Sequence, residues 1–275
     1  MSAHPWKSKT AIVCGASDGL GREFARQLCQ QSVGTLVLLA RGNQRLQATC
    51  DQLRSEFPNI SISTFAVDMS CTDAVGDLAA ELAKTHTAVD LVIQAVGKSD
   101  RGTIRDLTKS SLLEQFDANL FPSLNAIKVL TSVVRQPGGV VVLVGSLASH
   151  FAPRFLGGYA VAKHAVAALA QQARLELEES GIHVMLASPG PIARADAGSR
   201  YNAYLADKSL PVDAVKPGGG ARLEGLDAAR LASDILQAAT RRKPLCIYPR
   251  KARWLYILSA ISPTLGDRLL RKNTS

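Results

Sequence analysis

The chain has 275 residues, of which 47% are hydrophobic and 20% charged, a composition that indicates a globular protein with a sizeable core and excludes a disordered or low-complexity chain. No apolar run approaches the roughly 20 residues of a membrane-spanning helix, and the short polar segment before Thr10 is not typical of a signal peptide, so we expect a cytoplasmic protein. The formal net charge is +9, but the excess of basic residues lies after Arg241 and matches no recognised nucleic-acid motif, so nucleic-acid binding is not expected.

The first predicted element is a strand, Thr10–Cys14, which leads through a glycine-rich turn into a helix, Arg22–Gln31. A strand, a glycine-rich turn and a helix in this order are the usual setting for a dinucleotide. Glycines let the backbone turn sharply and approach the pyrophosphate at the positive end of the helix. The residues of the turn expected to contact the cofactor are Gly15, Ser17, Gly19, Leu20 and Gly21.

The second predicted strand, Thr35–Ala40, is followed by Arg41. An acidic residue at this place favours NAD by binding the ribose hydroxyl, whereas an arginine accommodates the 2′-phosphate of NADP. Arg41 therefore favours NADP(H). Asp18, inside the glycine turn, points the other way and keeps NAD(H) as an alternative.

Helices and strands alternate through most of the remaining chain. This alternation predicts a single α/β domain over residues 1–248, a doubly wound parallel seven-stranded sheet of the Rossmann type. The further predicted elements are the helix Asn43–Glu56, the strand Ile60–Val67, the helix Asp73–His86, the strand Asp90–Ala95, the helix Leu112–Arg135, the strand Val140–Val144, a helix from Tyr159 to about Glu179, the strand Ile182–Ala187, the helix Asp227–Thr240 and the strand Leu245–Tyr248.

The alternation stops between Pro189 and Leu226, where prolines and glycines interrupt the chain. A long insertion after the carboxyl end of a strand predicts a lid over the substrate, at about residues 190–226. Tyr201, Tyr204 and Leu205 would supply an apolar wall there. Simple surface decoration is the alternative for this segment.

The segment Gly145–Lys163 contains the residues best suited to acid–base chemistry. Tyr159 and Lys163 are four residues apart, so they share one face of a helix. The lysine charge favours the phenolate and lowers the pKa of the tyrosine, which makes Tyr159 a candidate general acid/base. Ser146 follows the strand Val140–Val144 at its carboxyl end, where ligands bind in open α/β sheets.

Together these residues resemble the short-chain dehydrogenase/reductase family over about residues 10–248. Asn119, Ser146, Tyr159 and Lys163 match its catalytic tetrad in order and spacing. The resemblance also implies cofactor contacts by the glycine turn and by Asp68, Gly97, Tyr159, Lys163, Pro189, Gly190 and Ile192. The sequence departs from the family pattern at Cys14, Gln94–Gly97 and Arg194.

The resemblance implies an NADP(H)-dependent carbonyl reductase that acts on a small-molecule carbonyl or alcohol. Tyr159 would protonate the developing alkoxide, Ser146 would donate a hydrogen bond to the same oxygen, Lys163 would bind the nicotinamide ribose, and Asn119 would hold a water molecule. An NAD-linked alcohol dehydrogenase and a non-catalytic protein that senses the cofactor are the alternatives. The family also implies a homodimer or homotetramer.

The C-terminal tail, residues 249–275, mixes basic residues with tryptophan, tyrosine, leucine and isoleucine. This composition fits an interfacial helix on the cytoplasmic face of an anionic membrane, and equally a helix packed on the body or on another subunit. A membrane contact would suit a lipophilic carbonyl substrate. No metal site is expected, because the five cysteines are scattered without metal-binding spacing.

Overall fold

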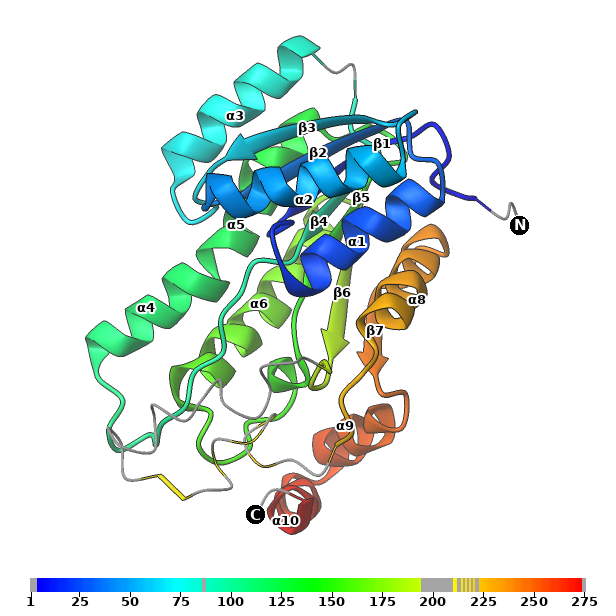
Figure 1. Ribbon diagram of the computed structural model, residues 1–275. Coiled ribbons are helices and arrows are strands. Elements are labelled where there is room, and N and C mark those ends of the chain that lie inside the picture. The colour runs from blue at the N-terminus through cyan, green and yellow to red at the C-terminus, as the bar shows by residue number, and fades with distance from the viewer. Residues whose placement is uncertain are drawn as a thin grey trace.

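The computed structural model describes residues 4–85, 88–193, 210–211, 214, 216, 218, 220 and 223–273. In this part of the chain, a parallel seven-stranded sheet has the order β3-β2-β1-β4-β5-β6-β7 (Figure 1). The order reverses between β1 and β4, the arrangement of a doubly wound sheet. The strands are β1 Thr10–Cys14, β2 Thr35–Ala40, β3 Ser61–Ala66, β4 Leu91–Gln94, β5 Val140–Val144, β6 His183–Pro189 and β7 Leu245–Tyr248.

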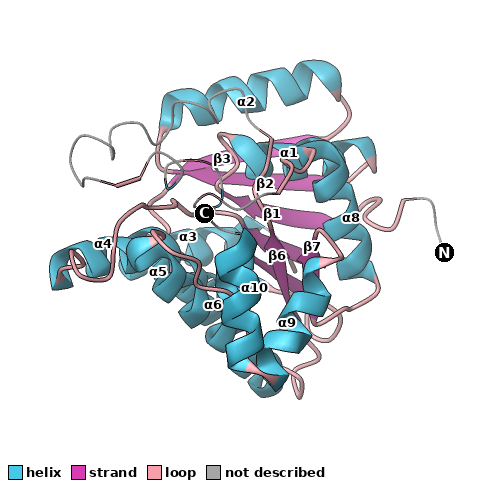
Figure 2. Ribbon diagram, turned by 90° about the horizontal axis from the view of Figure 1, so that it is seen from below, coloured by secondary structure: helices cyan, strands magenta, loops and turns pink. Residues whose placement is uncertain are grey.

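Helices cover both faces of the sheet (Figures 1 and 2). Helices α1, α2 and α8 pack on one face, while α3, α5 and α6 pack on the other, with α4 beside α6. The helices are α1 Gly19–Gln30, α2 Asn43–Glu56, α3 Thr72–Thr85, α4 Lys109–Asn119, α5 Phe121–Lys128, α6 Gly157–Glu176, α8 Ala228–Thr240, α9 Ala252–Ile261 and α10 Pro263–Asn273, together with the short 3-10 turns η1 Leu130–Val133 and η2 Leu147–Ser149.

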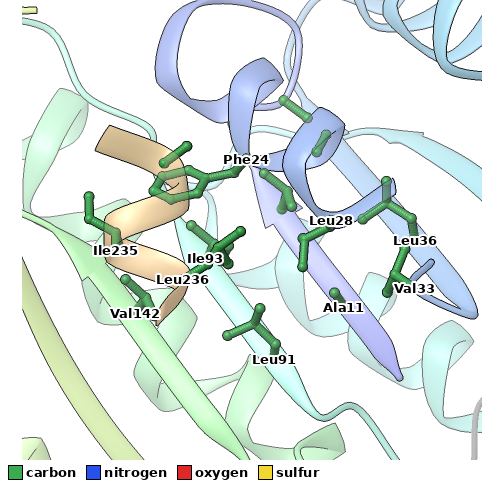
Figure 3. Close-up of a cluster of buried hydrophobic side chains, with 14 of the residues drawn as sticks. Ala11, Phe24, Leu28, Val33, Leu36, Leu91, Ile93, Val142, Ile235 and Leu236 are labelled. Atoms are coloured by element: carbon green, nitrogen blue, oxygen red, sulfur yellow. The ribbon is translucent and has the colours of Figure 1, made fainter. Parts of the chain in front are cut away.

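The central strands are continuous apolar runs in the sequence because both faces of the sheet are buried in the core. Side chains alternate between the two faces, and on one face Ile93 and Val142 pack beneath Phe24 of α1 and Ile235 of α8 (Figure 3). The intervening residues, such as Val92, pack beneath the helices of the opposite face. A sheet covered on both sides buries every residue of its central strands, so polar alternation disappears.

The helices α1, α3, α6 and α8 differ from their predicted bounds by one to three residues at one or both ends, and one predicted helix is divided. The predicted helix Leu112–Arg135 divides into α4, α5 and η1, and Pro122, at the start of α5, has no N–H to continue the hydrogen bonding of α4. Helix α1 begins at Gly19 rather than Arg22, because the Asp18 carboxylate accepts a 2.6 Å hydrogen bond from Gly19 N.

The predicted tail forms two helices, α9 and α10, separated at Ser262 just before Pro263. None of the described helices combines the length and the apolar character needed to cross a bilayer. The aromatic and apolar residues predicted for the lid, Tyr201, Tyr204 and Leu205, lie outside the described residues, as does Arg194. The lid itself stays a prediction.

Candidate active site

A cavity of about 1080 Å³ lies at the carboxyl ends of β1, β2, β4, β5 and β6. Its size suits a dinucleotide together with a small substrate better than a small ligand alone. Two predicted site residues, Asp68 and Asn119, do not line it. The other predicted site residues all do: Gly15, Ser17, Gly19, Leu20, Gly21, Arg41, Gly97, Ser146, Tyr159, Lys163, Pro189, Gly190 and Ile192.

The glycine turn forms one end of the cavity, at the N-terminus of α1. A Cβ atom on Gly21 would lie 2.1 Å from the carbonyl oxygen of Gly15, so only glycine lets the helix start this close to the turn. Gly15 N and Ala16 N both donate to Leu39 O, at 2.7 and 3.1 Å, which ties the turn to β2. The N-terminus of α1 therefore opens on the cavity, with Asp18 as its capping residue, and such a helix end can bind a pyrophosphate.

Two guanidinium groups, those of Arg41 and Arg45, line the cavity beyond the end of β2. Asp68 is exposed, and its Oδ1 accepts hydrogen bonds from Ser70 N and Ser70 Oγ at 2.9 and 2.8 Å. Partial burial raises the pKa of Asp68, but the Ser70 hydrogen bonds and the charge of Arg41 outweigh it and hold that pKa below its ordinary value. The neighbours of Asp68, Val67 and Met69, form the cavity wall in its place.

Lys163 is buried beside Tyr159. Its ammonium donates to Val144 O at 3.1 Å and lies 5.9 Å from the centroid of the Tyr159 ring. Only 3% of the lysine is exposed, and this burial lowers the pKa of Lys163 from 10.5 to about 8. The cavity therefore has a desolvated cation close to a phenol, where charge acts more strongly than in water.

Asn119 lies behind the cavity wall and holds the turn that follows β4. Its amide donates to Lys98 O at 3.0 Å, and its Oδ1 accepts from Lys98 N at 3.2 Å. Gln115 also accepts from this amide, through its backbone oxygen at 3.1 Å and its Oε1 at 3.3 Å. A Cβ atom on Gly97 would lie 2.9 Å from Asn119 Oδ1 and 3.2 Å from Lys163 Nζ, so this turn is in close contact with both side chains.

Ser146 lines the cavity just after β5. Its Oγ accepts from Ala148 N at 3.1 Å, and its own N–H donates to Ser149 Oγ at 3.2 Å. This pair of bonds caps the short turn η2 and fixes the serine backbone in an extended conformation. Because a hydroxyl that accepts one hydrogen bond retains its own O–H, Ser146 can still donate to a ligand.

Several cavity residues were not predicted from the sequence. Arg45 lies in the first turn of α2, four residues after Arg41. Leu255 and Leu270 come from the tail, while Lys98 and Arg101 come from the loop after β4. Of these, Arg101 is 1% exposed, and it donates to Asp100 O and Lys216 O at 2.7 and 3.2 Å.

Two departures from the family pattern lie within the described sheet. Cys14 is fully buried at the end of β1, and burial raises the pKa of its thiol. Gln94 is 1% exposed in β4, and neither its Nε2 nor its Oε1 has a hydrogen-bond partner among the described residues. The first residue of the Gln94–Gly97 departure is therefore a buried amide that forms no side-chain hydrogen bond with the described residues.

Comparisons with known proteins agree with this architecture. The solved structure of a short chain dehydrogenase/reductase from Burkholderia phymatum in complex with NAD is 20% identical, covers 95% of this chain and 96% of its own, and superposes with a TM-score of 0.79. The L-sorbose reductase of Gluconobacter frateurii, solved with NADPH and L-sorbose, is 17% identical, covers 90% of this chain and 97% of its own, and gives a TM-score of 0.76.

Sequence relatives identify the family. Dehydrogenase/reductase SDR family member 7B of Danio rerio is 31% identical over 249 residues, which cover 86% of this chain and 76% of the relative. The family model described as short chain dehydrogenase matches residues 9–204. The chain therefore belongs to the short-chain dehydrogenase/reductase family, as its glycine turn and its Tyr159–Lys163 pair predict.

Proposed function

We propose that the protein is an NADP(H)-dependent oxidoreductase that reduces a carbonyl group, or oxidises a secondary alcohol in reverse. The observation that carries the proposal is the convergence of Ser146, Tyr159 and the buried Lys163 on the same cavity as the glycine turn. An acid/base, a hydrogen-bond donor and a desolvated cation at one site are what protonation of a carbonyl oxygen requires.

When bound, the reduced nicotinamide supplies a hydride to the carbonyl carbon. Tyr159 donates its phenolic proton to the carbonyl oxygen as negative charge develops there. Ser146 donates a hydrogen bond to the same oxygen and orients it. The Lys163 ammonium, close to the phenol, stabilises the phenolate that remains. Asn119 holds the Gly97–Lys98 turn against Lys163. The water molecule expected at Asn119 would link Lys163 to solvent.

The preference for NADP(H) rests on charge. Arg41 and Arg45 both line the cavity where β2 ends, and guanidinium groups are well suited to bind a phosphate. The acid that favoured NAD(H), Asp18, caps α1 through Gly19 N. An NAD-linked alcohol dehydrogenase remains the alternative, and titration of both cofactors into the wild type and Arg41→Ala distinguishes the two.

The Tyr159→Phe variant tests the reaction itself. Loss of the phenolic hydroxyl should lower the rate of NADPH oxidation with a panel of carbonyl substrates by at least about a hundredfold, because general acid catalysis typically contributes 100- to 10,000-fold. NADPH binding, measured by quenching of protein fluorescence, should be retained. Tyr248→Phe is the matched control, since Tyr248 lies in β7 and does not line the cavity.

Two results would contradict the proposal. Wild-type rates in Tyr159→Phe would remove this residue as the acid. NADPH binding without turnover of any carbonyl or alcohol by the wild type would indicate a non-catalytic protein that senses the cofactor. The homodimer or homotetramer, the cytoplasmic location with a membrane-surface contact, and the lipophilic substrate are proposals as well, based on the family resemblance and the composition of the tail.

A further inference from the structure

The two C-terminal helices form a hairpin over the open end of the cavity. We name residues 250–273, which contain α9 and α10, the C-terminal hairpin; it lies at the carboxyl edge of the sheet near β7 (Figures 1 and 2). The side chain of Tyr256 packs on His150, with ring centroids 4.6 Å apart, and this contact fixes α9 to the body. Four hairpin residues line the cavity: Lys251, Ala252, Leu255 and Leu270.

The opposite face of the hairpin is apolar and exposed. Trp254, Leu258 and Ile261 are 70%, 39% and 77% exposed. At about 100° per residue these three side chains fall within about 60° of one another on α9, whereas Ala252 and Tyr256 lie about 160° from Trp254 and Leu255 lies about 100° from it. One face of α9 therefore closes the cavity while the other presents large apolar groups to solvent.

Such exposure is concentrated in the hairpin. Of the nine exposed large hydrophobic residues in the described part of the chain, four belong to it, the fourth being Leu265 at 38%. Others are scattered over separate elements, such as Ile104 in a loop and Leu175 on α6. Isolated surface leucines are ordinary, but a cluster that includes a tryptophan marks an interaction surface.

The charges around this apolar face indicate which kind of partner it would bind. The hairpin contains a single acid, Asp267, against six basic residues: Arg250, Lys251, Arg253, Arg268, Arg271 and Lys272. A symmetric contact between two copies would place the same basic patch against itself. An apolar face with an excess of lysine and arginine complements a bilayer that contains anionic phospholipid.

The positive charge continues onto the body beside the cavity. A smaller hollow of about 220 Å³ adjoins the hairpin and is lined by Arg154 of the loop before α6 together with Arg271 and Asp267. Pro153 and Leu270 border both this hollow and the main cavity. Anionic headgroups drawn to these arginines would therefore meet the protein where the cavity wall ends.

We propose that the C-terminal hairpin docks on an anionic phospholipid bilayer through Trp254, Leu258 and Ile261, so that a lipophilic carbonyl substrate passes from the lipid into the cavity behind Leu255 and Leu270. The membrane docking is inferred from the hairpin residues alone, whereas the passage of a substrate also rests on the proposed function. This arrangement gives α9 a double role, as a wall of the cavity and as the membrane contact.

Flotation of the full-length protein with vesicles tests the docking. Wild type should float with vesicles of phosphatidylcholine and phosphatidylserine, less with phosphatidylcholine alone, and less at high salt. The double variant Trp254→Glu/Ile261→Glu should lower the partition coefficient at least about tenfold, because it replaces two large apolar anchors with charges. Ile104→Glu/Leu175→Glu is the matched control, with 71% and 64% exposed residues outside the hairpin, and it should float as wild type.

Activity measurements separate the two halves of the proposal. The hairpin variant should reduce a water-soluble carbonyl at the wild-type rate, which also reports that it is folded, but reduce a long-chain carbonyl in anionic vesicles several-fold more slowly. Absence of wild-type flotation would overturn the docking, and so would a hairpin variant that floats normally. If light scattering showed a dimer for the wild type and a monomer for the hairpin variant, with no change in flotation, this face would be a contact between two copies of the chain. Normal flotation with no turnover of any carbonyl would leave the docking standing and refute the proposed function.

Discussion

Replacing Lys163 with methionine should stabilise the cofactor-free protein while destroying its activity. Lys163 is 3% exposed, and burial lowers its pKa from 10.5 to about 8. At neutral pH the folded chain therefore retains a desolvated ammonium that is solvated by water in the unfolded chain. Methionine has a similar length and shape and needs no solvation, so the variant avoids this cost.

The size of the effect follows from proton linkage. A fall in pKa from 10.5 to about 8 corresponds to about 3 kcal/mol, at about 1.4 kcal/mol per pH unit. Below pH 8 both states bind the proton, and the folded state has the full cost. Between pH 8 and 10.5 only the unfolded state retains the proton, so the wild type gains stability as the pH rises through this window. Above 10.5 neither state is charged, and the cost has gone.

Urea unfolding of wild type and Lys163→Met, followed by circular dichroism at pH 7 and pH 10.5, measures this difference. The advantage of the variant should be about 3 kcal/mol smaller at pH 10.5 than at pH 7, since other groups titrate equally in both proteins. Lys84→Met is the control, because Lys84 is exposed on α3 and water solvates its charge in both states. An advantage that does not change between the two pH values would refute the argument that Lys163 is a desolvated charge.

Three further predictions concern the site. The double variant Arg41→Ala/Arg45→Ala should weaken NADPH binding at least about tenfold while leaving NADH binding unchanged, because two phosphate-binding guanidiniums are lost; fluorescence titration with each cofactor checks this. Gly97→Ala should destabilise the fold by about 1–3 kcal/mol and lower kcat, because its Cβ would lie 2.9 Å from Asn119 Oδ1 and 3.2 Å from Lys163 Nζ; thermal unfolding and steady-state rates check this. The kcat/KM for carbonyl reduction should fall above a pH of about 8, where Lys163 loses the charge that stabilises the Tyr159 phenolate; a wild-type pH–rate profile that stays flat through pH 8 would contradict this.

The strand bounds could be predicted closely because the burial of a strand depends on the few consecutive residues that form it. β1, β2, β5 and β7 have the predicted bounds, and β4 differs by one residue at each end. The central strands β1, β4 and β5 are short apolar runs covered on both faces, so the burial of nearly every residue is visible in the sequence. The predicted helix Leu112–Arg135 was wrong as one element, because the apolar pattern continues through Pro122 although the hydrogen bonding of α4 does not.

The nucleotide end of the site was predictable for a related reason. Gly15, Arg41, Gly97 and Ser146 each lie within three residues after the end of a parallel strand, and the carboxyl ends of parallel strands meet at one edge. Asp68 was expected to contact the cofactor, yet its Oδ1 accepts two hydrogen bonds from Ser70 and its side chain does not line the cavity. A family motif fixes the position of a residue along the backbone, but the hydrogen bonds of its neighbours decide where the side chain points.

The substrate end depends on contacts between distant segments, and this is why the sequence alone left it open. Leu255 and Leu270 reach the cavity because only residues 249–251 separate α9 from β7, and because Tyr256 packs on His150 in the loop after β5. The basic and apolar composition of the tail was equally compatible with a membrane, the body or a second subunit. In the structure, one face of α9 packs on the body. The exposed face with Trp254 is a separate surface, and its charge and apolar area determine which partner it can bind. A single amphipathic helix can therefore pack on the body with one face and bind a different partner with another face. Its amino-acid composition is the same whether it makes one of these contacts or both.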